Sequence, residues 1–84
     1  MPKEQTHVFT DPTPEEQTDL TRRAKAAWFA GGEAGTPDET SGYLNFQGLG
    51  YVALRQQGAL LGVYRVRSDN LMLRRMKRPP KGLA

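Results

Sequence analysis

The stretch that decides the fold is residues 43–67, "YLNFQGLGYVALRQQGALLGVYRVR". Short runs rich in aromatic and branched side chains alternate here with the tripeptides "GLG" and "QQG", which are typical of turns. Successive side chains of a strand point to opposite faces, so Val52 and Leu54 share one face and Tyr51, Ala53 and Arg55 the other. The spacing predicts an antiparallel β-meander.

The run at residues 59–67 is apolar on both faces for most of its length. Alternation places Leu61, Val63, Arg65 and Arg67 on one face of this strand. Gly62, inside the strand, indicates a bulge or a bend. A strand that is apolar on both sides favours a small, strongly bent sheet, such as an SH3-like half-barrel.

A fourth run, "LMLRRM" at residues 71–76, follows the tight turn "SDN". A short helix capped by Ser68 or Asp69 is an alternative for this run. A tight turn after a long strand returns the chain beside it, which favours a strand. The meander therefore spans residues 43–76 and has three to four strands.

The segment that precedes the meander predicts one amphipathic helix over residues 13–30. Thr13 and Glu16 have the spacing of a capping box, and Pro14 suits the first helical position. An apolar stripe follows at helical spacing, and two glycines end the helix. The stripe consists of Leu20, Ala24, Ala27 and Trp28.

The remaining segments complete a single small α+β domain. Residues 1–12 predict a mobile arm, and "GGEAGTPDETSG" at residues 31–42 predicts a flexible acidic linker. Residues 77–84 form a basic tail that contains two prolines.

Composition narrows the classes of function. The chain has no cysteine, which excludes disulfides, thiolate nucleophiles and Cys-based zinc sites and agrees with a cytoplasmic location. No apolar run is long enough to span a bilayer, and the first residues lack the apolar stretch of a secretory signal, so we expect no membrane partner.

Catalytic and metal-binding patterns are sparse. The single histidine, His7, lies in the predicted arm, and the acids Asp38 and Glu39 lie in the glycine-rich linker. The linker lacks the spacing and the lysine of a phosphate-binding loop, and calcium-loop spacing is absent. We expect neither an enzyme nor a resident cofactor or metal.

Charge is distributed unevenly along the chain. Residues 1–42 carry four cations against eight acids, a net −4, and residues 43–84 carry eight cations against one acid, a net +7. Arginine forks bind phosphate bidentately, and tyrosines between them can stack on bases, so a surface for RNA or DNA is our first hypothesis. The residues of this hypothesis are Arg55, Arg65, Arg67, Arg74, Arg75, Lys77, Arg78, Lys81, Tyr51 and Tyr64.

The alternative hypothesis is a protein-interaction module: a subunit, an adaptor or a small inhibitor that docks on an acidic partner, or a homodimer. The acidic half could also lie across the basic half and neutralise it. Under this reading the two tyrosines are core residues and the arginines give solubility. Its candidate anchors are Phe29, Tyr43, Phe46, Met72 and Met76.

Overall fold

A computed structural model describes residues 12–67 and 69–83 of the chain. The predicted arm, apart from Pro12, and with it His7, lies outside the described residues. Within them no helix has the length and apolarity needed to cross a membrane. The elements in chain order are α1 (Pro14–Ala30), β1 (Gly42–Phe46), β2 (Leu49–Gln56), β3 (Ala59–Val66) and β4 (Leu73–Arg75).

Helix α1 begins and ends where the sequence predicts. The capping box is present: the Thr13 amide donates to Glu16 Oε1 (2.8 Å), and the Glu16 amide donates to Thr13 Oγ1 (3.1 Å). Leu20, Ala24 and Trp28 form the buried side of the helix. Three of the four residues of the predicted stripe thus lie against the sheet, as an amphipathic helix requires, whereas the fourth, Ala27, is exposed.

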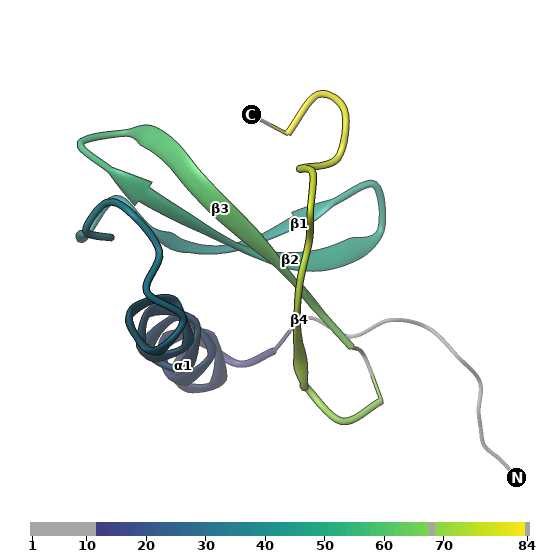
Figure 1. Ribbon diagram of the computed structural model, residues 1–84. Helices are drawn as coiled ribbons and strands as arrows, with labels where there is room; N and C mark the ends of the chain where they lie inside the picture. Colours follow the sequence, from purple (N-terminus) through teal and green to yellow (C-terminus); the bar gives the residue numbers. More distant parts are fainter. Residues whose placement is uncertain (1–11, 68, 84) are drawn as a thin grey trace, which may run out of the picture.

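The four strands form one antiparallel sheet in the order β1-β2-β3-β4 (Figure 1). Both tight turns, Gln47-Gly48 and Gln57-Gly58, have positive φ at both residues, as the turns that match the twist of a hairpin require. The predicted α+β class and antiparallel sheet of three to four strands are confirmed, with four strands, and the last run is a strand. The sheet is open, with β1 and β4 at its edges.

Apolar side chains pack on both faces of this sheet. The face under α1 buries Leu20, Ala24, Trp28, Val52, Leu54, Tyr64 and Val66. The opposite face buries Tyr51, Val63 and Leu83. Strands β2 and β3 therefore contribute to two small apolar clusters.

A bulge changes the alternation of β3. Arg55 pairs with Leu60 and Leu54 with Gly62, so Leu61 is an extra residue in the strand. The bulge thus lies beside Gly62, where a bulge or bend was predicted. The prediction that Leu61 and Val63 share a face is wrong, because the extra residue places Leu61 against the helix side and Val63 on the other side.

The predicted linker is tied to the sheet and to α1 at several points. The indole N–H of Trp28 donates to the Gly35 carbonyl (3.1 Å). Asp38 donates its amide to the Arg55 carbonyl (2.9 Å) and accepts the Gln57 amide at Oδ2 (2.7 Å). The segment therefore follows the hairpin between β2 and β3, and its flexibility stays a prediction.

The segment after β4 turns back over the sheet (Figure 1). The Leu83 amide donates to the Pro80 carbonyl (3.0 Å), and the Leu83 side chain is only 7% exposed. It packs in the same cluster as Tyr51 and Val63. Residues 77–83 thus close the apolar face that α1 leaves open.

Candidate functional site

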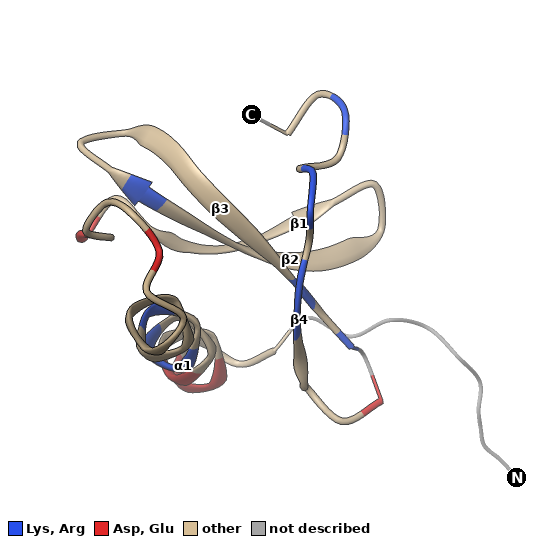
Figure 2. Ribbon diagram, viewed as in Figure 1, with Lys and Arg blue, Asp and Glu red and all other residues tan. Residues whose placement is uncertain are grey.

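Cationic side chains gather along β4 and the segment after it, whereas the acids lie mostly on α1 and the segment that follows the helix (Figure 2). Of the basic residues predicted for this half, one group is exposed, and its side chains form no hydrogen bond or ion pair with the described residues. We call this group the cationic strip: Arg65, Arg74, Lys77, Arg78 and Lys81.

Arg65 and Arg74 form the centre of the cationic strip. They are directly opposite each other in the antiparallel pair of β3 and β4, so their side chains leave the same face of the sheet. Like charges in such a pair destabilise a sheet. Among the described residues neither arginine has an ion pair with an acid that would offset the repulsion, so a bound anion would relieve it.

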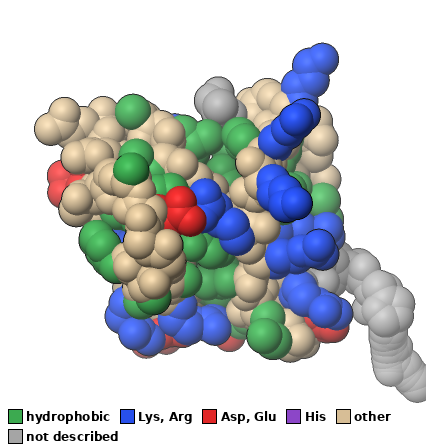
Figure 3. All heavy atoms as spheres, viewed as in Figure 1, with side chains coloured by type: hydrophobic (Ala, Val, Ile, Leu, Met, Phe, Trp, Pro, Cys, Tyr) green, Lys and Arg blue, Asp and Glu red, His purple; other side chains and the backbone are tan. Residues whose placement is uncertain are grey.

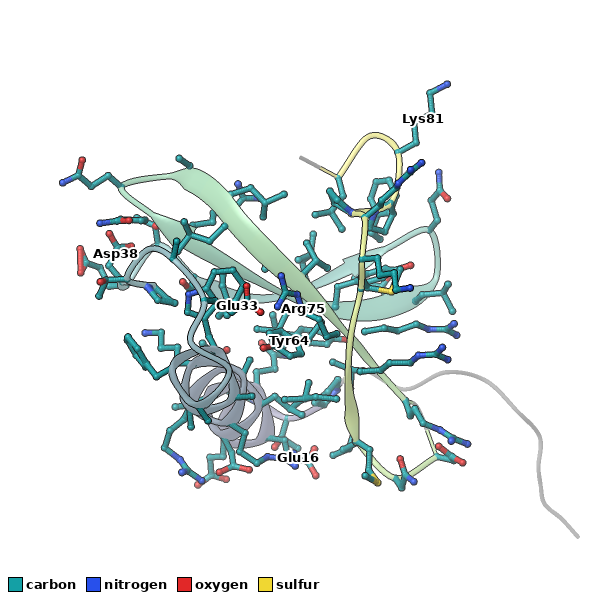
Figure 4. The ribbon with its side chains drawn as sticks, in the orientation of Figure 1. Glu16, Glu33, Asp38, Tyr64, Arg75 and Lys81 are labelled. Atoms are coloured by element: carbon teal, nitrogen blue, oxygen red, sulfur yellow. The ribbon has the colours of Figure 1, made fainter. Side chains whose placement is uncertain are left out.

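The other members follow β4 directly. Lys77, Arg78 and Lys81 are exposed, and Leu83 anchors their segment to the sheet. Figure 3 shows basic side chains in a column along this side of the molecule. Lys81 extends away from the body of the protein (Figure 4). The strip therefore presents its charge to solvent from an anchored backbone.

Arg67 is occupied by a local ion pair. Its guanidinium donates to both carboxylate oxygens of Asp69, at 3.1 Å from Nε and 2.9 Å from Nη2. The hydrogen bond from Arg67 holds the pKa of Asp69 below its ordinary value. This exposed pair neutralises Arg67, so we leave it out of the strip.

Arg75 points to the opposite face of the sheet from Arg74 and is also engaged. Its Nη1 donates to Glu33 Oε2 (2.7 Å), and its guanidinium carbon lies 4.7 Å from the centroid of the Trp28 ring. Figure 4 shows Glu33 and Arg75 together beside Tyr64. The hydrogen bond to Glu33 raises the pKa of Arg75. Arg75 therefore joins β4 to α1 and to the predicted linker.

Arg55 lies at the other end of the hairpin. Its Nη1 donates to the Gly58 carbonyl (3.3 Å) in the turn between β2 and β3. Its pairing with Leu60 places it at the start of β3, whereas Arg65 is near the end of that strand. The structure thus separates Arg55 from the cationic strip.

The two tyrosines of the nucleic-acid hypothesis are buried. Tyr51 is 5% exposed and Tyr64 is 6% exposed, each within a different apolar cluster. The Tyr51 ring packs edge-on against Phe46, with 6.4 Å between the ring centroids. A base has no room to stack on either ring. Both tyrosines therefore belong to the core and are not part of the candidate surface.

Of the five predicted protein-interface residues, two are exposed and three pack against the apolar clusters. Phe29 is 56% exposed and Met72 is 57% exposed. Tyr43 packs against the helix-side cluster, and Phe46 and Met76 pack against the other one. Of the two exposed anchors, Met72, in the loop before β4, is the nearer in sequence to the cationic strip, two residues before Arg74.

Sequence reasoning missed the role of Leu83. The residue stands alone near the end of a basic, proline-containing segment, which reads as a tail. The available signal is an apolar side chain just after Gly82, whose positive φ turns the chain towards Phe46. This turn gives the basic segment a fixed position on the sheet.

An open groove of about 740 Å³ lies between α1 and the start of β1. Its lining comes from residues 14–25 of the helix and from residues 39–43, including Glu39 but none of the cationic strip. In residues 12–67 and 69–83, no group of three or more acids or histidines is placed to hold a metal ion. The strip is therefore the candidate site we pursue.

Comparison of the chain with protein-family models, with curated proteins and with solved structures found no match. The candidate site therefore rests on the geometry and charge of the residues themselves.

Proposed function

We propose that this protein binds the phosphate backbone of a nucleic acid through the cationic strip, as a non-enzymatic binding or regulatory protein. The observation that carries the proposal is the Arg65–Arg74 pair, two like charges placed opposite each other with no ion pair to any acid in residues 12–67 and 69–83. Guanidinium forks match phosphate oxygens in geometry and charge. A phosphate between the two arginines would convert their repulsion into two charge-assisted contacts.

Selective pairing elsewhere on the surface supports the proposal. Arg22, Arg67 and Arg75 each lie beside an acid in the described structure. The members of the cationic strip do not, although all five are exposed. Uncompensated charge on one side of a small protein raises the local concentration of anionic partners and speeds their association.

Two finer features of the proposal concern shape and location. The open, bulged sheet, covered by α1 on one face and by residues 77–83 on the other, would be a small SH3-like half-barrel that holds the strip in place. The absence of cysteine favours a reducing compartment such as the cytoplasm.

The test is a fluorescence-anisotropy titration of a labelled oligonucleotide duplex with the full chain at 50 mM salt. Arg65→Gln/Arg74→Gln should weaken binding about 100-fold, because each lost phosphate contact forgoes roughly a tenfold gain from ion release at this salt concentration. Arg22→Gln/Lys25→Gln makes the same change in net charge on α1 and should leave the affinity within about twofold.

Folding of both variants is checked by thermal melting. The strip variant should be at least as stable as the parent, since the substitution removes a like-charge pair. Equal loss of affinity in the two variants would reduce the effect to overall charge and would refute the assignment of the strip.

A protein-interaction module is the second candidate, and the exposure of Met72 favours it. Its flexible apolar side chain is 57% exposed beside the cationic strip, a combination that suits an acidic protein partner with an apolar anchor, or a second copy of the chain. Met72→Glu should then abolish partner capture or dimer formation while leaving the affinity for nucleic acid unchanged.

A further inference from the structure

We infer that the cationic strip takes double-stranded nucleic acid in preference to single strands. The inference rests on the proposed function and deepens it. Three features of the described residues carry it: the strip has no stacking surface, its backbone is fixed, and its contacts are purely cationic.

The first feature is the position of the aromatic rings. Proteins that hold single strands without sequence preference combine a basic groove with exposed aromatic side chains on which bases stack. Among the described residues only one ring, that of Phe29, is exposed. Phe29 is on α1, which packs against the face of the sheet opposite to Arg65 and Arg74. On the face that carries the strip, Phe46 is half-buried and packs edge-on against Tyr51, so no described residue offers the strip an exposed ring for an unstacked base.

The second feature is the rigid support of the charges. Arg65 and Arg74 are held in register by paired strands, and the Met76 amide continues the pairing with the Val63 carbonyl (2.9 Å). Pro79 and Pro80 restrict the segment that follows, and Leu83 fixes its far end in the second apolar cluster. A fixed set of cations suits the regular phosphates of a duplex.

A flexible single strand must lose conformational freedom to follow such a surface. Base stacking normally offsets this cost when proteins bind single strands. Without an exposed ring at the strip, only electrostatic attraction offsets the entropic cost of ordering the strand. The fixed backbone of the strip and the burial of the tyrosines therefore both disfavour binding of single strands.

The third feature concerns counterions. Five phosphate contacts give a salt slope of about −4.5 on B-DNA and about −3.5 on a single strand, because the duplex condenses more ions for each phosphate. If the two affinities converge near 1 M salt, the duplex binds about 20-fold more tightly at 50 mM salt. Purely cationic contacts thus favour the duplex before any cost of ordering is counted.

The experiment is a competition assay with the full chain at 50 mM salt. A labelled duplex of mixed sequence is displaced by unlabelled duplex, by either of its separated strands, and by poly-glutamate at equal total charge. We expect the duplex to compete at least tenfold better than either strand, and Arg65→Gln/Arg74→Gln to weaken duplex binding while Arg22→Gln/Lys25→Gln does not.

Each other outcome has a distinct meaning. Equal or stronger competition by single strands overturns this inference and leaves the proposed function intact. Failure to bind any nucleic acid overturns the proposed function as well. Stronger competition by poly-glutamate than by the unlabelled duplex would assign the strip to an acidic protein partner. Duplex preference that persists in the strip variant would place binding on another surface.

Discussion

At the scale of single residues, Gly62 is the described glycine with the least room for a side chain, because the Trp28 ring lies against it. A Cβ atom at Gly62 would lie 2.5 Å from Cζ3 of the Trp28 ring, closer than any real contact allows. The indole must therefore rest directly on the backbone of β3. The same ring stacks on Arg75, and its N–H donates to the Gly35 carbonyl. The indole therefore contacts α1, β3, β4 and the segment of residues 31–42 that follows the helix.

We predict that Gly62→Ala destabilises the protein by about 1–3 kcal/mol, the usual cost of overpacking a filled core. Gly42→Ala is the matched control in the sheet, because a Cβ there meets no atom within 4 Å. Urea unfolding followed by circular dichroism measures both. Equal midpoints for the two variants would show that Trp28 does not rest on β3.

Asp38 gives a pH-dependent prediction. Hydrogen bonds from the Thr40 side chain and from the Gln57 and Thr40 amides lower the pKa of Asp38 below its ordinary 3.8. A depressed native pKa contributes stability above the pKa of the unfolded chain, and this contribution disappears as pH falls through the native value. The loss therefore begins near pH 4 and is complete only at lower pH.

We expect Asp38→Asn to be less stable than the parent at pH 7, with the difference shrinking below pH 4. Denaturant unfolding at several pH values measures it. Glu39→Gln is the control, since Glu39 accepts no hydrogen bond from the described residues. A difference that is constant with pH would contradict the role of the Asp38 carboxylate.

At the scale of elements, sequence patterns predicted the helix and the hairpins, whose structure depends on residues close together in the chain. The capping box, the apolar stripe and the terminal glycines specify α1 within the segment itself, and the two tight turns specify neighbouring antiparallel strands. The face of Leu61 was beyond such patterns, because a bulge depends on how the partner strand pairs. Leu83 was missed because its partners, Tyr51 and Val63, lie far away in sequence.

The docking of residues 77–83 can be tested as an element. Leu83→Ala should destabilise the protein by about 2 kcal/mol, the low end for a buried leucine, because the site is near the surface. Leu49→Ala, at a leucine that is 38% exposed against 7% for Leu83, should destabilise the protein by clearly less. Guanidinium unfolding gives both values, and equal effects would mean that the segment does not cover the sheet.

At the scale of the whole molecule, the fold selects among the cations. The charge pattern of the sequence indicated a basic half, and all five residues of the cationic strip were among the predicted binding residues. It could not predict which cations have acidic partners, because the contact between Arg75 and Glu33 spans 42 positions. Tyr64 is buried under α1. The sequence could not predict the burial of Tyr51, since an alternating strand looks alike whether its second face is solvated or covered. In this structure residues 77–83 cover that face.

The proposed function requires the cationic strip to bind phosphate groups. The most direct test is the salt dependence of duplex binding, measured as the slope of log K against log salt concentration for the full chain. We expect a slope of about −4.5 for the parent and about −2.7 for Arg65→Gln/Arg74→Gln, because two of five phosphate contacts are lost. A slope near zero, or one that the substitution leaves unchanged, would contradict the proposed function.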